Sequence, residues 1–213
     1  MIYDRIYFFG DSITLGCNDS AGLGWPGRLC RGLSHNGESV AAYNLGINGD
    51  TSLDIKNRWQ NEITARNRDS SGLIVFAFGF NDVSRKNGET RQLELEQSLD
   101  IARSMLLAAV KLSRVLWVGP TPLDQSVNPM QSEFANWLTY NNDIVELDQA
   151  YAKLADELKI DYLSLVNNFL VNKRYQSALV AGDKVHPADD GYELIAENII
   201  SWQAWRSISD RKI

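Results

Sequence analysis

The segment at residues 72–78, Gly-Leu-Ile-Val-Phe-Ala-Phe, constrains the fold of this chain more than any other. It is continuously apolar and lacks the alternation of polar and apolar residues that a half-exposed strand shows. Such a run is expected of a strand that is buried on both faces, as in a parallel sheet covered by helices on two sides. The run therefore predicts an α/β fold.

Strand-like and helix-like segments alternate along the rest of the sequence. The expected strands lie at residues 5–9, 39–45, 72–78, 115–118 and 160–165. The expected helices lie at 25–33, from a cap at Thr51 or Ser52 to about Ala65, at 95–109, at 134–158, and after Pro187. This alternation predicts a three-layer α/β/α sandwich with a mostly parallel five-stranded sheet, in one domain over residues 1–213. Ligands of such folds bind beyond the carboxyl ends of the strands.

The composition limits the classes of function. With 44% hydrophobic and 23% charged residues, the 213-residue chain has the balance of a globular protein with a sizeable core. The net charge of −6, without a local cluster of Lys and Arg, argues against nucleic acid as a partner. We see no apolar run of the roughly 18 residues that a membrane span needs. We also see no signal peptide, and two cysteines are too few for a disulfide framework, so we expect a cytoplasmic location.

Ser12 and His186 are the first candidates for chemistry. Ser12 directly follows the first expected strand, where its hydroxyl would stand at the carboxyl edge of the sheet. The chain has two histidines, and we expect His35, in a polar turn, to be a surface residue. His186 lies in Asp-Lys-Val-His-Pro, and a carboxylate three residues earlier, Asp183, can fold back to accept the Nδ1–H bond and orient the ring. Alternatively, these residues only shape a helix entrance that starts at Pro187.

Two further loops follow the second and third expected strands. The first contains Asn-Gly-Asp-Thr at 48–51, where Gly49 would let the backbone approach a substrate and donate its N–H to an oxyanion. The second contains Gly-Phe-Asn-Asp at 79–82, where the side-chain amide of Asn81 could be aimed at the same point. Each loop taken alone is also compatible with an ordinary turn.

In this order, the four motifs resemble those of the SGNH (GDSL) hydrolase family. They are Phe-Phe-Gly-Asp-Ser-Ile-Thr-Leu-Gly at 8–16 and the motifs at 48–51, 79–82 and 183–187. The resemblance implies a flavodoxin-like α/β fold and a serine esterase or lipase that needs no metal or organic cofactor. It implies that Ser12 is the nucleophile, His186 the base and Asp183 its orienting carboxylate. The oxyanion donors would be the backbone amides of Ser12 and Gly49 and the side chain of Asn81.

The substrate class stays open at this point. A family resemblance of this kind implies a small-molecule ester or thioester: a short-chain acyl ester, an acetylated carbohydrate, an acyl-CoA or a lysophospholipid. An alternative is a non-catalytic α/β binding module that retains the hydrolase scaffold. The oligomeric state is also left open by the sequence.

Three more residues near the motifs have two interpretations each. Asp11 and Asp82 could suggest a metal pair, but no further ligand is spaced to complete a site, so we expect them to hold loop backbone by hydrogen bonds. Trp25, in Gly-Trp-Pro-Gly, resembles a tryptophan near the substrate mouth in this family, and it could equally belong to the core. Trp25 and Asp11 are therefore the candidates for contacts with the substrate.

Overall fold

A computed structural model describes residues 3–31, 33, 40–66, 72–132 and 135–209 of the chain. Its centre is a five-stranded sheet with the order β2-β1-β3-β5-β8, in which every pairing is parallel. The strands are β1 (Arg5–Gly10), β2 (Ala41–Gly46), β3 (Leu73–Ala77), β5 (Val115–Val118) and β8 (Asp161–Leu163). This is the flavodoxin-like strand order, and it confirms the predicted fold class.

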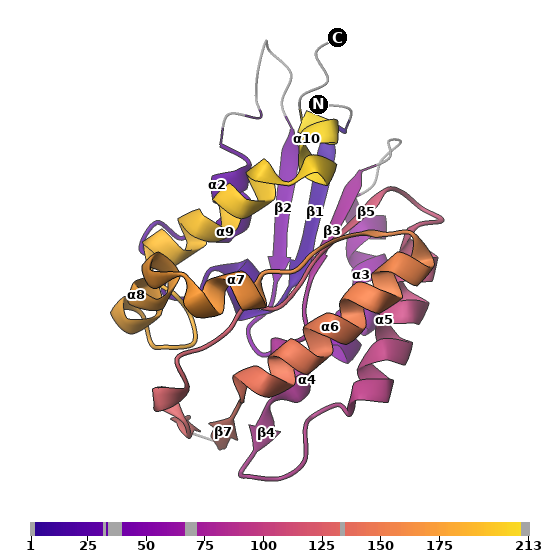
Figure 1. Ribbon diagram of the computed structural model, residues 1–213. Coiled ribbons are helices and arrows are strands. Elements are labelled where there is room, and N and C mark those ends of the chain that lie inside the picture. The colour runs from indigo at the N-terminus through magenta and orange to yellow at the C-terminus, as the bar shows by residue number, and fades with distance from the viewer. Residues whose placement is uncertain (1–2, 32, 34–39, 67–71, 133–134, 210–213) are drawn as a thin grey trace.

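Helices cover both faces of the sheet (Figure 1). One layer contains α3 (Ser52–Arg66), α5 (Leu95–Ala109) and α6 (Asn141–Leu158), and the other contains α2 (Gly24–Leu29), α7 (Val166–Val171), α8 (Lys173–Ala181), α9 (Asp189–Ser201) and α10 (Gln203–Ser209). Alternate residues of β3 enter the two cores, since Ile74 and Phe76 pack in the first layer while Leu73 and Val75 pack in the second. The continuous apolar run thus serves two cores at once, as predicted.

The register of β1 with its neighbours β2 and β3 sets the position of the loops that follow these three strands. Gly10 at the end of β1 lies level with Gly46 of β2 and with Ala77 of β3. A Cβ atom at Gly10 would lie 2.1 Å from Thr14 Oγ1, and one at Gly46 would lie 2.2 Å from the backbone N of Leu15. Glycine at both strand ends therefore lets the short helix α1 (Ser12–Leu15) pack directly on the edge of the sheet.

One expected helix is wrong over its first part. We expected a helix over 134–158, but α6 begins at Asn141, and Asn136–Leu138 form the strand β7 (Phe134 itself lies outside the described residues). β7 pairs antiparallel with β4 (Arg85–Lys86) and with β6 (Met130–Gln131) in a small second sheet. The side chain of Asn128 adds hydrogen bonds to both the N–H and the carbonyl of Thr139, which keeps the chain extended up to α6.

Other boundaries differ by a few residues. The strand expected at 39–45 is β2 at Ala41–Gly46, with Ser39 outside the described residues, and the helix expected at 25–33 is α2, which ends at Leu29. Thr51 caps α3, since its hydroxyl oxygen accepts from the N–H of Asp54, while its own N–H and hydroxyl donate to the Asp54 carboxylate. The short helices α1, α4 (Phe80–Val83), α7 and α8 were not predicted. No helix within the described ranges combines the length and apolar character needed to cross a membrane.

The close approach at Gly46 can be tested by a Gly46→Ala substitution. The added Cβ would collide with the backbone of α1, so we expect the free energy of unfolding to fall by about 1–3 kcal/mol. Urea unfolding of the wild type and the variant measures the difference. Ala42→Ser, at an exposed position of the same strand, serves as the control and should change stability by less than about 0.5 kcal/mol. Equal stability of the Gly46→Ala variant and the wild type would show that α1 does not rest on the strand end.

Candidate active site

Ser12, His186 and Asp183 form a continuous chain of hydrogen bonds. His186 Nε2 lies 2.8 Å from Ser12 Oγ, and His186 Nδ1 lies 2.7 Å from Asp183 Oδ2. When Nδ1 carries the proton, its N–H donates a hydrogen bond to the Asp183 carboxylate. Nε2 is then free to accept a hydrogen bond from the hydroxyl of Ser12. The structure therefore brings together three residues that the sequence separates by up to 174 positions.

Ser12 owes its position to the start of α1. Asp11 adopts an extended conformation and its carboxylate accepts from the N–H of Ile13 at 2.9 Å, which caps the helix. The helix ends after one turn, because Gly16 takes a left-handed conformation (φ 94°). Ser12 is thus the first residue of a helix, and the N–H groups of a first turn have no partner within the helix.

The loop at 183–187 is shaped by the carboxylate of Asp183. Asp183 Oδ1 accepts from the N–H groups of Val185 (3.0 Å) and His186 (2.7 Å), while Oδ2 faces the imidazole. Lys184 takes a left-handed conformation (φ 72°), within a turn too tight for an extended chain. Burial raises the pKa of Asp183, but the hydrogen bonds from His186 and from the backbone lower it more, so the pKa lies well below its usual range.

The segment that follows Ser12 is bound to the helix that follows His186. The N–H of Ser20 donates to Asp189 Oδ1 at 2.8 Å, and the hydroxyl of Tyr192 donates to the carbonyl of Cys17 at 2.5 Å. Next to these contacts, the guanidinium of Arg28 forms a buried ion pair with Asp19. The bonds from Ser20 and Tyr192 hold the segment after Ser12 against α9, and with them Ser12 near His186.

The loops of the expected oxyanion donors start from neighbouring strand ends. Ser12 lies two residues beyond Gly10, Gly49 three beyond Gly46 and Asn81 four beyond Ala77, and these strand ends are level in the sheet. Gly49 is exposed and has φ 86°, a conformation that favours glycine. Asn81 Nδ2 donates to the carbonyl of Asp50 at 2.9 Å, which fixes the amide and leaves its second N–H for a ligand.

Asp11 and Asp82 hold backbone, as predicted. The carboxylate of Asp82 is fully buried and accepts from the N–H and the hydroxyl of Ser52, both at 2.7 Å, and from Tyr151. Burial raises the pKa of Asp82, and burial raises the pKa of Asp11 to about 6. Among the residues that the structure describes, no group of three or more His, Cys, Asp or Glu is placed to hold a metal ion.

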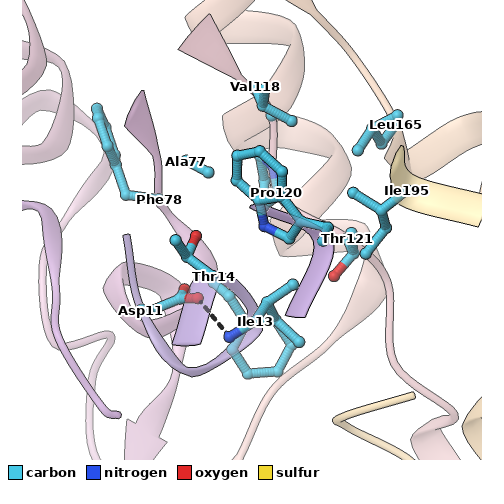
Figure 2. A pocket seen from close by; sticks show the side chains of 13 residues that line it. Asp11, Ile13, Thr14, Ala77, Phe78, Val118, Pro120, Thr121, Leu165 and Ile195 are labelled. Atoms are coloured by element: carbon cyan, nitrogen blue, oxygen red, sulfur yellow. Dashed lines mark hydrogen bonds between the residues drawn. The ribbon is translucent and has the colours of Figure 1, made fainter. Parts of the chain in front are cut away.

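The structure places Trp25 in the core instead of at a substrate mouth. Its side chain is 1% exposed and packs edge to face on Phe8, with ring centroids 5.2 Å apart. Asp11 is also buried and directs its carboxylate to Ile13 (Figure 2). Both residues line a cavity of about 20 Å³ below the strand ends, and neither presents its side chain to the surface in this structure. His35, the other histidine, lies outside the described residues.

Two residues that contribute to the site, Arg58 and Asp189, were not predicted from the sequence. Arg58 of α3 bonds to the ends of β1 and β2 and to Asp50, and Asp189 bonds to the segment after Ser12. Both lie on expected helices, at positions where a charged residue is expected to point into solvent. The sequence holds no local signal for them, because their partners come from other strands and loops.

Comparison with known proteins identifies the family. The model of the GDSL-like lipase/acylhydrolase family matches residues 8–194, and the chain belongs to this family of ester hydrolases. An acetylxylan esterase from Geobacillus stearothermophilus is 26% identical over 207 residues, which cover 91% of this chain and 90% of that protein. The crystal structure of the lipase/acylhydrolase from Enterococcus faecalis has a TM-score of 0.74 at 25% identity and covers 97% of this chain and 96% of its own. A lipolytic G-D-S-L family protein from Veillonella parvula shares the fold, with a TM-score of 0.71, 20% identity and coverage of 94% and 98%.

The raised pKa of Asp11 predicts a pH effect on stability. A carboxyl group whose pKa rises from 3.8 in the unfolded chain to about 6 in the folded one binds more protons when folded, so stability falls as pH rises between these values. We expect the Asp11→Asn variant, which keeps an oxygen acceptor for Ile13, to lack this fall. Because one pKa unit corresponds to about 1.4 kcal/mol, the wild type should lose on the order of 3 kcal/mol relative to the variant from pH 4 to 7.

Urea unfolding at several pH values measures this difference. Parallel stability curves for the wild type and the Asp11→Asn variant would contradict the raised pKa.

Proposed function

We propose that this ester hydrolase works by acyl transfer to Ser12, with His186 as general base and Asp183 as the carboxylate that orients it. The observation that carries the proposal is the chain of contacts from Ser12 Oγ through the imidazole to Asp183, with distances of 2.8 and 2.7 Å. A nucleophile, a base within hydrogen-bond reach and a third group that orients the base are the requirements of nucleophilic catalysis.

The reaction proceeds in two halves. Ser12 Oγ attacks the acyl carbon while His186 Nε2 takes its proton, and the tetrahedral intermediate forms with a negative oxygen. His186 then gives the proton to the leaving oxygen or sulfur, the bond to the leaving group breaks, and an ester on Ser12 remains. A water molecule attacks this ester, gives its proton to His186, and the collapse of the second intermediate returns the proton to Ser12 Oγ and releases the acid.

Asp183 and the three N–H donors stabilise charge during these steps. The carboxylate of Asp183 stays ionised because its pKa is low, so it stabilises the imidazolium that forms when His186 takes the proton. The N–H groups of Ser12, Gly49 and Asn81 would bind the oxyanion. Preorganised donors of this kind lower the barrier because they need no rearrangement during the reaction.

For the substrate, we propose the acetyl ester of a carbohydrate. The similarity to an acetylxylan esterase over nearly the whole length of both chains supports this class. Acyl-CoAs and lysophospholipids are then expected to be poor substrates.

A hydrolysis panel tests the nucleophile and the substrate class. We expect the wild type to cleave p-nitrophenyl acetate and acetylated xylooligosaccharides much faster than p-nitrophenyl palmitate or acyl-CoAs, and a fluorophosphonate to label it at one residue. The Ser12→Ala variant should show neither hydrolysis nor labelling, because it lacks the attacking oxygen. A wild type without labelling would support the binding-module alternative, and a preference for palmitate or acyl-CoA would contradict the proposed substrate.

The Asn81→Ala substitution tests the oxyanion donor. We expect kcat to fall by about 10²–10³-fold while KM changes little, because the donor acts on charge that develops in the transition state. Steady-state kinetics on p-nitrophenyl acetate and a thermal unfolding curve check the activity and the fold. A folded variant with near-normal kcat would remove Asn81 from the proposed oxyanion site.

A further inference from the structure

Arg58 of α3 lies across the ends of two neighbouring strands, β1 and β2. Its Nη2 donates to the carbonyl oxygens of Leu45 (2.8 Å) and Gly10 (3.2 Å), the carbonyls at the ends of β2 and β1. Its Nε donates to Asp50 Oδ2 at 2.7 Å. One half-buried guanidinium therefore joins the strand that leads to Ser12, the strand that leads to Gly49, and the loop that follows Gly49.

Asp50 links Arg58 to Asn81. The carboxylate of Asp50 binds Arg58, while its backbone carbonyl accepts from Asn81 Nδ2 at 2.9 Å. Burial raises the pKa of Asp50, and the hydrogen bond and charge of Arg58 oppose this shift. Arg58 thus offsets part of the effect of burial on the pKa of Asp50.

The loop at Gly49 has little packing of its own. Gly49 is exposed, and apart from its two chain neighbours no heavy atom of the described structure lies within 4 Å of the place where its Cβ would stand. The turn is closed by one hydrogen bond from the N–H of Asp50 to the carbonyl of Ile47, at 3.2 Å. The position of the Gly49 N–H therefore depends on the bonds that hold Asp50.

We propose that Arg58 is a positioning residue for the oxyanion site. Through Asp50 it sets where the Gly49 N–H and the Asn81 amide stand relative to Ser12. The inference rests on the proposed function, because it assigns Arg58 to donors that act only if an oxyanion forms beside Ser12.

The geometry requires arginine at this position. The planar guanidinium presents several N–H bonds in fixed directions and meets three acceptors at once, whereas the ammonium of lysine is a single charge at the end of a flexible chain. We therefore expect Arg58→Lys to keep the positive charge but to loosen the loop. A displacement of about 1 Å at a catalytic group can cost roughly a hundredfold in rate, so kcat should fall by about 10–100-fold while KM changes little.

Arg66→Lys is the matched control. Arg66 lies two turns further along α3, forms an ion pair with Glu62 and lies over the ring of Tyr43, as Arg58 lies over Phe9. It occupies the far end of the helix, away from the strand ends that carry the site. We expect the kcat of Arg66→Lys to stay within about twofold of the wild type, because its surface ion pair contributes little.

The experiment counts active sites before it compares rates. The wild type, Arg58→Lys, Arg66→Lys, Asn81→Ala and the double variant Arg58→Lys/Asn81→Ala are titrated with a fluorophosphonate, and kcat for p-nitrophenyl acetate is expressed per labelled site. Because Arg58 acts partly through Asn81, the loss in the double variant should be smaller than the product of the two single losses.

Three outcomes would contradict the proposed role of Arg58 or the function on which it rests. An Arg58→Lys variant that melts at a lower temperature but keeps its kcat per labelled site would show a purely structural role and overturn the inference. Losses that multiply in the double variant would overturn the action through Asn81. A wild type that is neither labelled nor active would instead overturn the proposed function, and the inference with it.

Discussion

The level ends of three parallel strands are the constraint on which the rest of the molecule depends. β1 lies between β2 and β3, and Gly10 is paired in register with Gly46 and Ala77. Because side chains are absent or small there, the chain can turn immediately into α1 and into the loops at Gly49 and Asn81. A shift of one residue in either pairing would move one loop by about 3.3 Å along the strand, which no side-chain rotation could compensate.

A second constraint holds the loop between α1 and α2 against α9. Arg28 and Asp19 form an ion pair whose side chains are almost fully buried, and the carboxylate also accepts from the N–H groups of Leu23 and Gly24. Such a pair offsets its desolvation only when further hydrogen bonds satisfy the charged groups, and the two backbone N–H groups do this for the Asp19 carboxylate. The pair gives the loop between α1 and α2 one defined shape, so Tyr192 of α9 finds the Cys17 carbonyl in a fixed place.

Those strands, helices and site residues were predictable that leave a periodic pattern or a motif in the sequence. The apolar runs located β1, β3 and β5, and the spacing of apolar residues located α5, because burial on one or two faces leaves a pattern within the segment itself. The motifs pointed to Ser12, Asp183 and His186, which the structure places in contact. The small sheet of β4, β6 and β7 has strands of two or three residues, too short for any period, and it exists through pairing between distant segments. Arg58 and the burial of Trp25 depend likewise on partners elsewhere in the chain.

The left-handed turn at Lys184 has a mechanical consequence. It directs the backbone carbonyl of Lys184 to the N–H of Asp124 (2.8 Å) and its ammonium to the hydroxyl of Ser126 (2.9 Å). The segment that carries the imidazole is thereby coupled to the 3₁₀ turn at Gln125–Val127, on a different connection of the fold. A displacement of either segment must therefore break these bonds or carry the other segment with it, which couples the loop of His186 mechanically to the turn at Gln125–Val127.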